Sequence, residues 1–327
     1  MERQLSLNPA SNYAVFFFAL FGLILCVAQV FGESPDYYSY NEFFDLVRSN
    51  GFEVLNLSRF EPGFSVLSIV LTPLVTSNIL VYSLIVAFAL FLKGWVISVC
   101  SINQRVFVIA VILYFFRFYP LHELTQLRAA CALGLLIVGA IFFWNGRKIS
   151  GILTFIVAVA FHMSVAILIP VLFLYSSNRW LVILASFSIF AIVSAGANIV
   201  SEFAANNIPV VAAYQATGFG DEVPDPFAIT LLLDWTMIVV SLFMWPKLTI
   251  LMRRIVLLEL IGMALFYSLL DFPAFPSRIR EAFSVFWLLF VTEGLRLNIF
   301  KIPIILFIGL SVVIYGYIYF IRGGFFN

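Results

Sequence analysis

Residues 149–176 read ISGILTFIVAVAFHMSVAILIPVLFLYS, an apolar run long enough to cross a bilayer but interrupted at His162. Arg147 and Lys148 precede the run, and Arg179 follows it. Short loops rich in lysine and arginine stay on the cytoplasmic side of a membrane, so both ends of the run belong on the same side. One simple crossing cannot satisfy both ends. The pattern predicts two short helices that meet at His162 and return, with His162 facing an outward-facing, water-filled cavity.

The rest of the chain has the composition of a membrane protein. Of its residues, 63% are hydrophobic and 11% are charged. We expect an all-α protein in which residues 1–327 form one integral-membrane domain with about ten segments, some broken or re-entrant. Pro73 predicts a kink or half-helix in the second segment. The expected segments are 13–32, 63–92, 106–120, 128–145, 149–176, 180–200, 227–246, 253–271, 281–298 and 302–321.

The charged residues predict the topology of the loops. Turns with an excess of lysine and arginine are expected inside; they are marked by Lys93 with Arg105, Arg147 with Lys148, Lys247 with Arg253 and Arg254, and Arg296 with Lys301. The segments 33–61 and 201–226 then form outer loops, and residues 39–50 have the spacing of an amphipathic helix on the outer surface. In this topology all four lysines are inside, and the outer basic residues are arginines.

This topology also gathers ionisable residues at the outer face. They are Asp36, Glu61, Arg117, His122, Arg128, His162, Arg278, Arg280 and Glu281. Any one of them alone fits an ordinary surface charge. Arg128 stands out because it opens a long apolar helix on the side where positive charge is disfavoured. Guanidinium groups stay charged and bind phosphate through two nitrogens, so the pattern indicates an extracytoplasmic site for a phosphate-bearing lipid.

The sequence shows no pattern typical of a cofactor site. The three cysteines, Cys26, Cys100 and Cys131, have no paired spacing, and the chain has two histidines and no Asp-x-Asp pair. We therefore expect no disulfide framework, metal ion or other cofactor, and no nucleic-acid partner. The acidic residues Asp221, Glu222 and Asp225 are interpreted as part of a solvated loop.

Five short motifs occur in the order found in the EpsG and Wzy-like bacterial polysaccharide polymerases, and the chain resembles that family over more than half of its length. The motifs are SPDYYSY at 34–40, RFEPGFSVL at 59–67, LTQLRAACALGL at 124–135, AFHMSVAIL at 160–168 and SRIREAF at 277–283. The resemblance implies a C-type glycosyltransferase architecture in the bacterial inner membrane, with the active site facing the periplasm.

The resemblance also implies the substrates. Donor and acceptor would be oligosaccharides linked to undecaprenyl diphosphate, with membrane lipids and a chain-length regulator as further partners to expect. In the family reaction a hydroxyl of the incoming repeat unit attacks the anomeric carbon of the donor chain, and the lipid diphosphate leaves. On that chemistry Arg128 and Arg278 are predicted to contact the diphosphate, with Arg280 and Arg117 as further candidates.

The proton acceptor is predicted among two residues. His162 is preferred because a neutral imidazole suits base catalysis at working pH. The other interpretation of His162 is a histidine that bonds the carbonyl of a broken helix. Glu61 is the alternative base, or else a salt-bridge partner at a helix start. Asp36, Tyr40 and Tyr214 are predicted to bind sugar, with ordinary loop capping as the other interpretation of Asp36 and Tyr40.

Two other functions fit parts of the sequence. A lipid-oligosaccharide flippase or transporter would use intramembrane acids such as Asp234 and Glu259 as a proton relay. Such proteins usually contain internal repeats, and none is found here. A membrane O-acyltransferase acting on the same glycans would need a catalytic histidine reached from the cytoplasm, whereas His162 is predicted on the opposite side.

Overall fold

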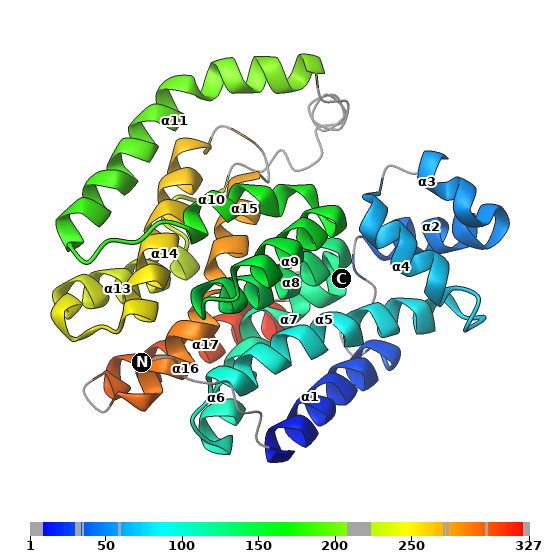
Figure 1. The fold of residues 1–327 in the computed structure, drawn as a ribbon, viewed down its shortest axis with the longest axis horizontal. Coiled ribbons are helices and arrows are strands. Elements are labelled where there is room, and N and C mark those ends of the chain that lie inside the picture. The colour runs from blue at the N-terminus through cyan, green and yellow to red at the C-terminus, as the bar shows by residue number, and fades with distance from the viewer. Residues whose placement is uncertain are drawn as a thin grey trace. The chain divides into compact units, whose positions relative to one another are not determined.

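The computed structural model describes residues 9–29, 34, 36–57, 60–207, 224–270, 272, 275–297 and 300–322. Every regular element in these ranges is helical, as expected from the sequence (Figure 1). Contacts divide the chain into two compact units, residues 1–170 with 291–327 and residues 171–290. Tyr214 lies outside the described residues, as does most of the predicted loop 201–226.

The first unit contains most of the helices. They are α1 (Pro9–Val27), α2 (Tyr37–Asn50), the 3-10 turn η1 (Gly51–Glu53), α3 (Val54–Leu57), α4 (Pro62–Leu71), α5 (Asn78–Cys100), α6 (Gln104–Arg117), α7 (Tyr119–Thr125), α8 (Leu127–Trp144), α9 (Lys148–Phe161), η2 (Met163–Ile167), α17 (Lys301–Gly316) and the π-helical turn η4 (Tyr317–Ile321). Two short helices, α10 (Ile169–Leu172) and α16 (Trp287–Arg296), run across the boundaries between the units.

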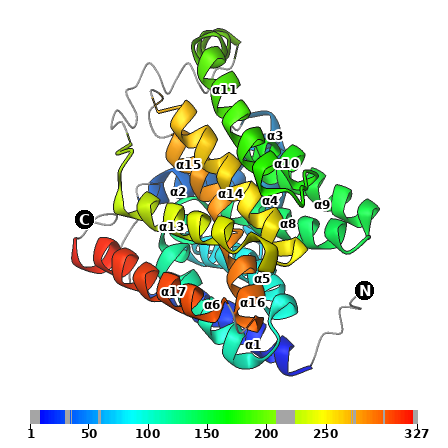
Figure 2. The same ribbon diagram turned by 90° about the vertical axis from the view of Figure 1, so that its left-hand side faces the viewer.

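The second unit is built on three longer helices and one short one. These are α11 (Arg179–Asn207), α13 (Ile229–Phe243), α14 (Ile250–Ser268) and α15 (Phe275–Ser284), with the 3-10 turn η3 (Trp245–Lys247) before α14. Figure 2 shows α11 running beside α14. The Ser268 hydroxyl of α14 donates a hydrogen bond to the Phe190 carbonyl of α11 at 3.2 Å.

Four helices are long and apolar enough to cross a membrane within the described ranges. They are Asn78–Cys100, Leu127–Trp144, Arg179–Gly196 and Lys301–Ile321, and a fifth results if the bent pair α6 and α7 counts as one span. The apolar helices α1, α4, α9 and α13, and the segment Met163–Leu172, are shorter. These lengths and compositions are those of a membrane-embedded protein. The predicted count of about ten segments includes the shorter helices and stays a prediction.

The second predicted segment is broken where Pro73 follows α4, as the sequence indicated. Arg48 of α2 fills the break: its Nη1 donates to the carbonyls of Thr72 at 2.8 Å and Val75 at 2.9 Å. A helix end inside a protein leaves carbonyls without partners, and this guanidinium supplies the missing donors. Asn78 opens α5 and accepts from the same guanidinium through its Oδ1 at 3.2 and 3.3 Å. The predicted amphipathic helix α2 is thereby tied to both α4 and α5.

The predicted break at His162 is also present. α9 ends at Phe161, and His162 has the extended backbone angles φ −159° and ψ 111° before the 3-10 turn η2 begins. α9 packs closely on α8, where a Cβ on Gly151 would come within 2.9 Å of the Gly139 carbonyl oxygen. Small residues of this kind let two membrane helices approach each other. The position of His162 is thus set by the tightly packed α8–α9 pair.

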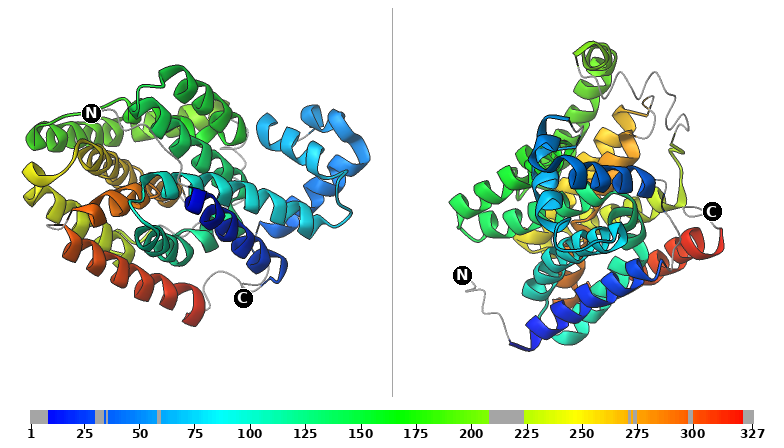
Figure 3. Two further views of the ribbon diagram at one scale, coloured as in Figure 1. Left: turned by 60° about the horizontal axis from the view of Figure 1, so that its bottom comes forward. Right: turned by 90° about the vertical axis from the view of Figure 1, so that its right-hand side faces the viewer.

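The α6–α7 pair bends by 64° at Phe118. Pro120 lies in the first turn of α7, where its missing N–H is tolerated, and it cannot continue α6. Two tyrosines hold the short α7 in place: the Tyr82 hydroxyl donates to the Leu124 carbonyl at 2.6 Å, and the Tyr119 hydroxyl donates to the Gly22 carbonyl at 2.7 Å. α1, which carries Gly22, packs along α5 (Figure 3).

Lys93 does not mark a cytoplasmic turn, so this prediction is wrong. It lies within α5, is buried, and forms an ion pair with the buried Glu123 of α7. The Lys93 ammonium also donates to the Tyr114 hydroxyl at 3.3 Å. A lone lysine next to an apolar run has the same sequence pattern as a span end. Only the packing of α7 against α5 reveals that a carboxylate neutralises it.

For the Lys93–Glu123 pair, we expect replacement of one partner to lower stability more than replacement of both. Lys93→Ala or Glu123→Ala leaves one buried charge without its partner and should cost about 3–5 kcal/mol, whereas the double variant Lys93→Met/Glu123→Leu should be close to the wild type. Thermal unfolding of the purified protein in detergent measures both. A double variant as unstable as either single one would contradict this account.

Candidate functional site

Three helix ends of the first unit bring together three residues singled out from the sequence. Glu61 is the N-cap residue of α4, Arg128 is the second residue of α8, and His162 is the C-cap residue of α9. Arg128 and His162 follow Glu61 by 67 and 101 positions in the sequence, and both contact its carboxylate. The structure therefore joins the predicted base candidates to the predicted diphosphate ligand Arg128.

Each oxygen of the Glu61 carboxylate has its own partners. Arg128 Nη1 donates to Oε2 at 2.6 Å, and His162 Nδ1 lies 2.9 Å from Oε1. The backbone N–H of Met163 also donates to Oε1, at 3.3 Å, so Glu61 caps the turn that follows the break. The side chains are 16% exposed for Glu61, 23% for His162 and 26% for Arg128. The cluster is therefore held firmly and still reaches the surface of the unit.

The electrostatics of the cluster fix the roles of its groups. Burial raises the pKa of Glu61, but the hydrogen bond from His162 and the charge of Arg128 outweigh it and lower that pKa to about 2. An ionised carboxylate only accepts hydrogen bonds, so His162 must carry a proton on Nδ1. In the neutral imidazole, Nε2 then holds the lone pair. Glu61 is therefore an orienting group for His162, and Nε2 is the atom able to take a proton.

An aromatic cluster lies under Arg128. The guanidinium carbon is 4.6 Å from the centre of the Phe60 ring, which stacks on Tyr40 with an interplanar angle of 12°. Phe43 and Phe64 pack against the same ring. The face of an aromatic ring attracts a cation and limits its movement. Phe60 was not selected from the sequence, although it stands directly before Glu61 in the motif RFEPG.

Tyr40 lies in this cluster and not on an open surface. Its ring is 4% exposed and contacts Phe60, Phe64 and Tyr82. Burial raises the pKa of its phenol, against the positive charge of Arg128, which lowers it. The structure therefore places Tyr40 as support beneath Arg128. Its predicted contact with sugar stays a prediction, as does that of Asp36, which precedes α2 and is partly exposed.

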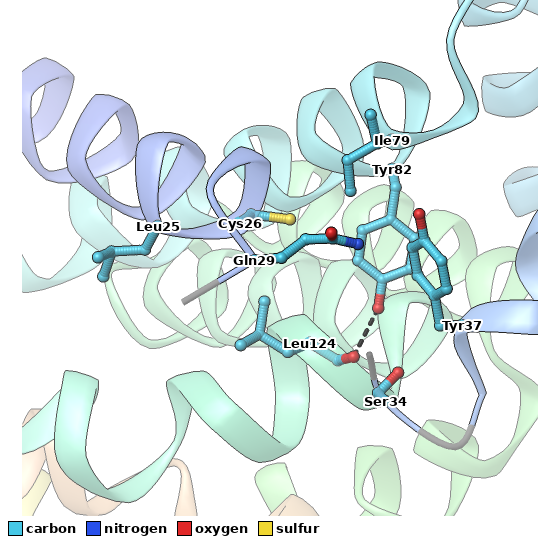
Figure 4. Close-up of a pocket in the computed structure, with 8 residues that line it drawn as sticks. All are labelled: Leu25, Cys26, Gln29, Ser34, Tyr37, Ile79, Tyr82 and Leu124. Carbon is cyan, nitrogen blue, oxygen red and sulfur yellow. Dashed lines mark hydrogen bonds between the residues drawn. The ribbon is translucent and has the colours of Figure 1, made fainter. Parts of the chain in front are cut away.

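Tyr82, which contacts Tyr40, also lines a small cavity (Figure 4). Its empty volume is about 280 Å³, part of it open to solvent, and it is lined by Leu25, Cys26, Gln29, Ser34, Tyr37, Ile79, Tyr82 and Leu124. Tyr82 spans the distance between this cavity and Tyr40, so the cavity adjoins the aromatic support of the Arg128 cluster.

The other predicted arginines have other partners. Arg117 is buried between α6 and α17, with its guanidinium over the rings of Phe118, Phe307 and Tyr315, so it does not share the contacts of Arg128. In the second unit, Nη1 of Arg280 lies 3.8 Å from Oδ2 of Asp234.

Arg278 and Arg280 both belong to the motif SRIREAF at 277–283, but their exposure differs. Arg278 is exposed, whereas Arg280 is 7% exposed and donates to the Thr230 hydroxyl at 3.2 Å. This difference follows from their i, i+2 spacing on a helix. Of the two, Arg278 is the one open to a ligand.

The described residues contain no group of three or more His, Cys, Asp or Glu side chains arranged to hold a metal ion. His122, the other histidine, is buried at 1% exposure next to Glu123. It is therefore separated from solvent, in contrast to His162.

Broken apolar helices around a partly exposed carboxylate, imidazole and guanidinium define a membrane protein with a polar site built at helix ends. Its motifs and their order agree with one family. The chain belongs to the EpsG family, whose family model matches residues 14–324. The family indicates a membrane polysaccharide polymerase of the glycosyltransferase kind, and the resemblance noted from the motifs is confirmed. No curated protein and no solved structure matches the chain.

The close contact of α4 with α9 at Gly63 predicts that a methyl group at this position lowers stability. A Cβ on Gly63 would lie 2.8 Å from the carbonyl carbon and oxygen of Ala160, so Gly63→Ala must push α4 away from α9. We expect a loss of about 1–3 kcal/mol in stability. Gly309→Ala is the matched control, because nothing lies within 4 Å of that position in helix α17. Equal thermal unfolding midpoints for the two variants would contradict the close contact.

The lowered pKa of Glu61 predicts a pH window. The pKa falls from the ordinary 4.5 to about 2, so the ionised carboxylate stabilises the folded state fully above about pH 4.5. That contribution is lost as the pH falls from 4.5 towards 2. The difference in unfolding midpoint between the wild type and Glu61→Gln should shrink as the pH falls from 5 to 3, because the Glu61 carboxylate gains its proton in the unfolded chain before it does in the folded one. A difference that stays the same from pH 5 to 3 would contradict the assignment.

Proposed function

We propose that this protein is a polysaccharide polymerase that transfers a growing glycan from undecaprenyl diphosphate to an incoming lipid-linked repeat unit. The proposal places it in the bacterial inner membrane, with a C-type glycosyltransferase architecture and with the Glu61 cluster facing the periplasm. The observation that carries it is the Glu61 carboxylate, which holds an imidazole at 2.9 Å and a guanidinium at 2.6 Å in a chain of the EpsG family.

The reaction needs a proton acceptor. A hydroxyl of the acceptor sugar attacks the anomeric carbon of the donor, and the bond from that carbon to the diphosphate oxygen breaks. The hydroxyl proton goes to Nε2 of His162, since Glu61 holds the other ring nitrogen in its N–H form. As the imidazole gains charge, the ionised Glu61 stabilises it. A single displacement of this kind inverts the configuration at the anomeric carbon.

The reaction also needs a counter-charge for the leaving group. Negative charge grows on the departing diphosphate, and a fixed guanidinium stabilises it without reorganisation. Arg128 is suited to this role because Glu61 bonds its Nη1 and Phe60 supports its plane. Arg278 of the second unit is exposed, and its contact with phosphate stays a prediction from the sequence. We propose that Arg128, and no metal ion, neutralises the leaving group.

Purified protein with lipid-linked repeat units tests the proposal. His162→Ala should lower kcat about 100-fold or more with little change in KM for the donor, since it removes the base and leaves the phosphate ligands. Arg128→Lys should raise KM and lower kcat, because an ammonium cannot replace the guanidinium fork. Arg147→Ala, an exposed arginine outside the cluster, is the control and should behave as the wild type.

The Glu61→Gln variant separates the effect of Glu61 on His162 from the binding of the donor by Arg128. The amide cannot stabilise an imidazolium, so kcat should fall by about tenfold or more, while the freed Arg128 should bind the donor at least as well. Failure of the wild type to elongate chains would overturn the proposal. Movement of the lipid-linked units across liposomes without elongation would show a transporter instead.

A further inference from the structure

Two turns of the second unit lie at the same end of its helices. One turn precedes α11, contains Tyr175 and leads into Arg179, the first residue of α11, and the other joins α13 to α14 and contains Trp245. Trp245 Nε1 donates to the Ser177 carbonyl at 2.7 Å, and Arg179 Nη1 donates to the Leu242 carbonyl at 3.3 Å. The first bond joins the two turns, and the second joins the start of α11 to the last turn of α13. The residues of the two turns therefore form one continuous surface.

This surface is strongly basic. It carries Arg179, Lys247, Arg253 and Arg254, and no aspartate or glutamate occurs in the sequence from 171 to 201 or from 235 to 258. Two of the arginines lie over aromatic rings: Arg254 lies over Tyr175 at 5.3 Å, and Arg253 lies over Trp245 at 5.7 Å.

The other two basic groups are Arg179, which lies over the ring of Trp180 at 5.1 Å, and Lys247. The side chain of Lys247 is exposed, and the three arginines have intermediate exposure. Positive charge gathered without carboxylates in the same segments attracts an anion, and the rings limit where the arginines can point.

An exposed apolar face begins at the same end. Leu181, Leu184 and Phe187 follow Arg179 at helical spacing on α11 and are 55%, 59% and 65% exposed. Only 11% of the Arg179–Gly196 window is buried inside the protein. A span of this hydropathy with so little burial faces lipid. The basic surface and an acyl-chain surface are therefore continuous, with tryptophan and tyrosine at their boundary, as at a membrane–water interface.

We infer that this basic surface, formed by Arg179, Lys247, Arg253 and Arg254, binds the headgroup of an anionic phospholipid of the cytoplasmic leaflet. The phosphodiester lies among the guanidinium and ammonium groups, and an acyl chain lies along Leu181, Leu184 and Phe187. Excess lysine and arginine in short turns assigns this end to the cytoplasm, where basic pockets between membrane helices bind such headgroups. The site belongs to the second unit alone and is independent of the proposed chemistry at Glu61.

The combination favours a lipid over a soluble anion. A free phosphate would use the cations and leave the adjoining apolar face without a role, whereas a phospholipid matches both in one molecule. Its affinity should therefore depend on headgroup charge and on the acyl chains together.

Native mass spectrometry of the full-length protein in a neutral detergent, titrated with phosphatidylglycerol, tests the inference. Lys247→Gln/Arg254→Gln should weaken phosphatidylglycerol binding by about tenfold or more, since it removes two cations that lie beside the turn. Arg147→Gln/Lys148→Gln is the matched control: it removes the same charge from another turn, where both residues are exposed and neither lies over an aromatic ring. The control should bind as the wild type does.

Three outcomes would overturn the inference. They are equal loss in the two double variants, equal binding of phosphatidylcholine, and displacement of the lipid by millimolar inorganic phosphate. If the double variant fails to fold, Lys247→Glu alone replaces it, because this exposed side chain supports no other residue, and a reduction of binding is again expected. Unchanged binding in that variant would equally contradict the site.

Discussion

The site depends on the hydrogen bonds that join the Glu61 carboxylate to Arg128 and His162. The two carboxylate oxygens hold side chains from two other helix ends, and the partly buried Arg128 requires a counter-charge at that position. The same carboxylate sets the proton on His162 Nδ1 and caps the turn at Met163. The orientation of the His162 imidazole, the placement of the Arg128 guanidinium and the end of the broken helix α9 therefore all depend on one side chain at the start of α4.

Broken helices make this arrangement possible, and side chains make the breaks possible. In a membrane, backbone groups freed at a break need partners from the protein. Arg48 supplies them at the α4–α5 break, Glu61 at the end of α9, and Tyr82 on α7. Each break thus brings a polar side chain to a place where a continuous helix would hold only apolar ones. The catalytic proposal uses one of these breaks.

Much of this architecture could be predicted from local signals. The breaks at Pro73 and His162, the helix over residues 39–50 and the family follow from residues that act on their own neighbours. Lys93 was misassigned because its partner Glu123 is 30 positions away and no local pattern links them. The link between Glu61 and Arg128 is of the same long-range kind. Their choice as candidates came from residue type and predicted topology, while their bonding partners needed the packing of α4, α8 and α9.

The two histidines of the chain stand in opposite surroundings. His122 is sealed inside the protein at 1% exposure, and the side chain of His162 is 23% exposed beside Glu61. A reagent that modifies imidazole from solution therefore meets one target in the whole polypeptide. Without any engineered label, the chain carries a single accessible imidazole, and a ligand that covers the Glu61 cluster can be followed as protection of that one ring.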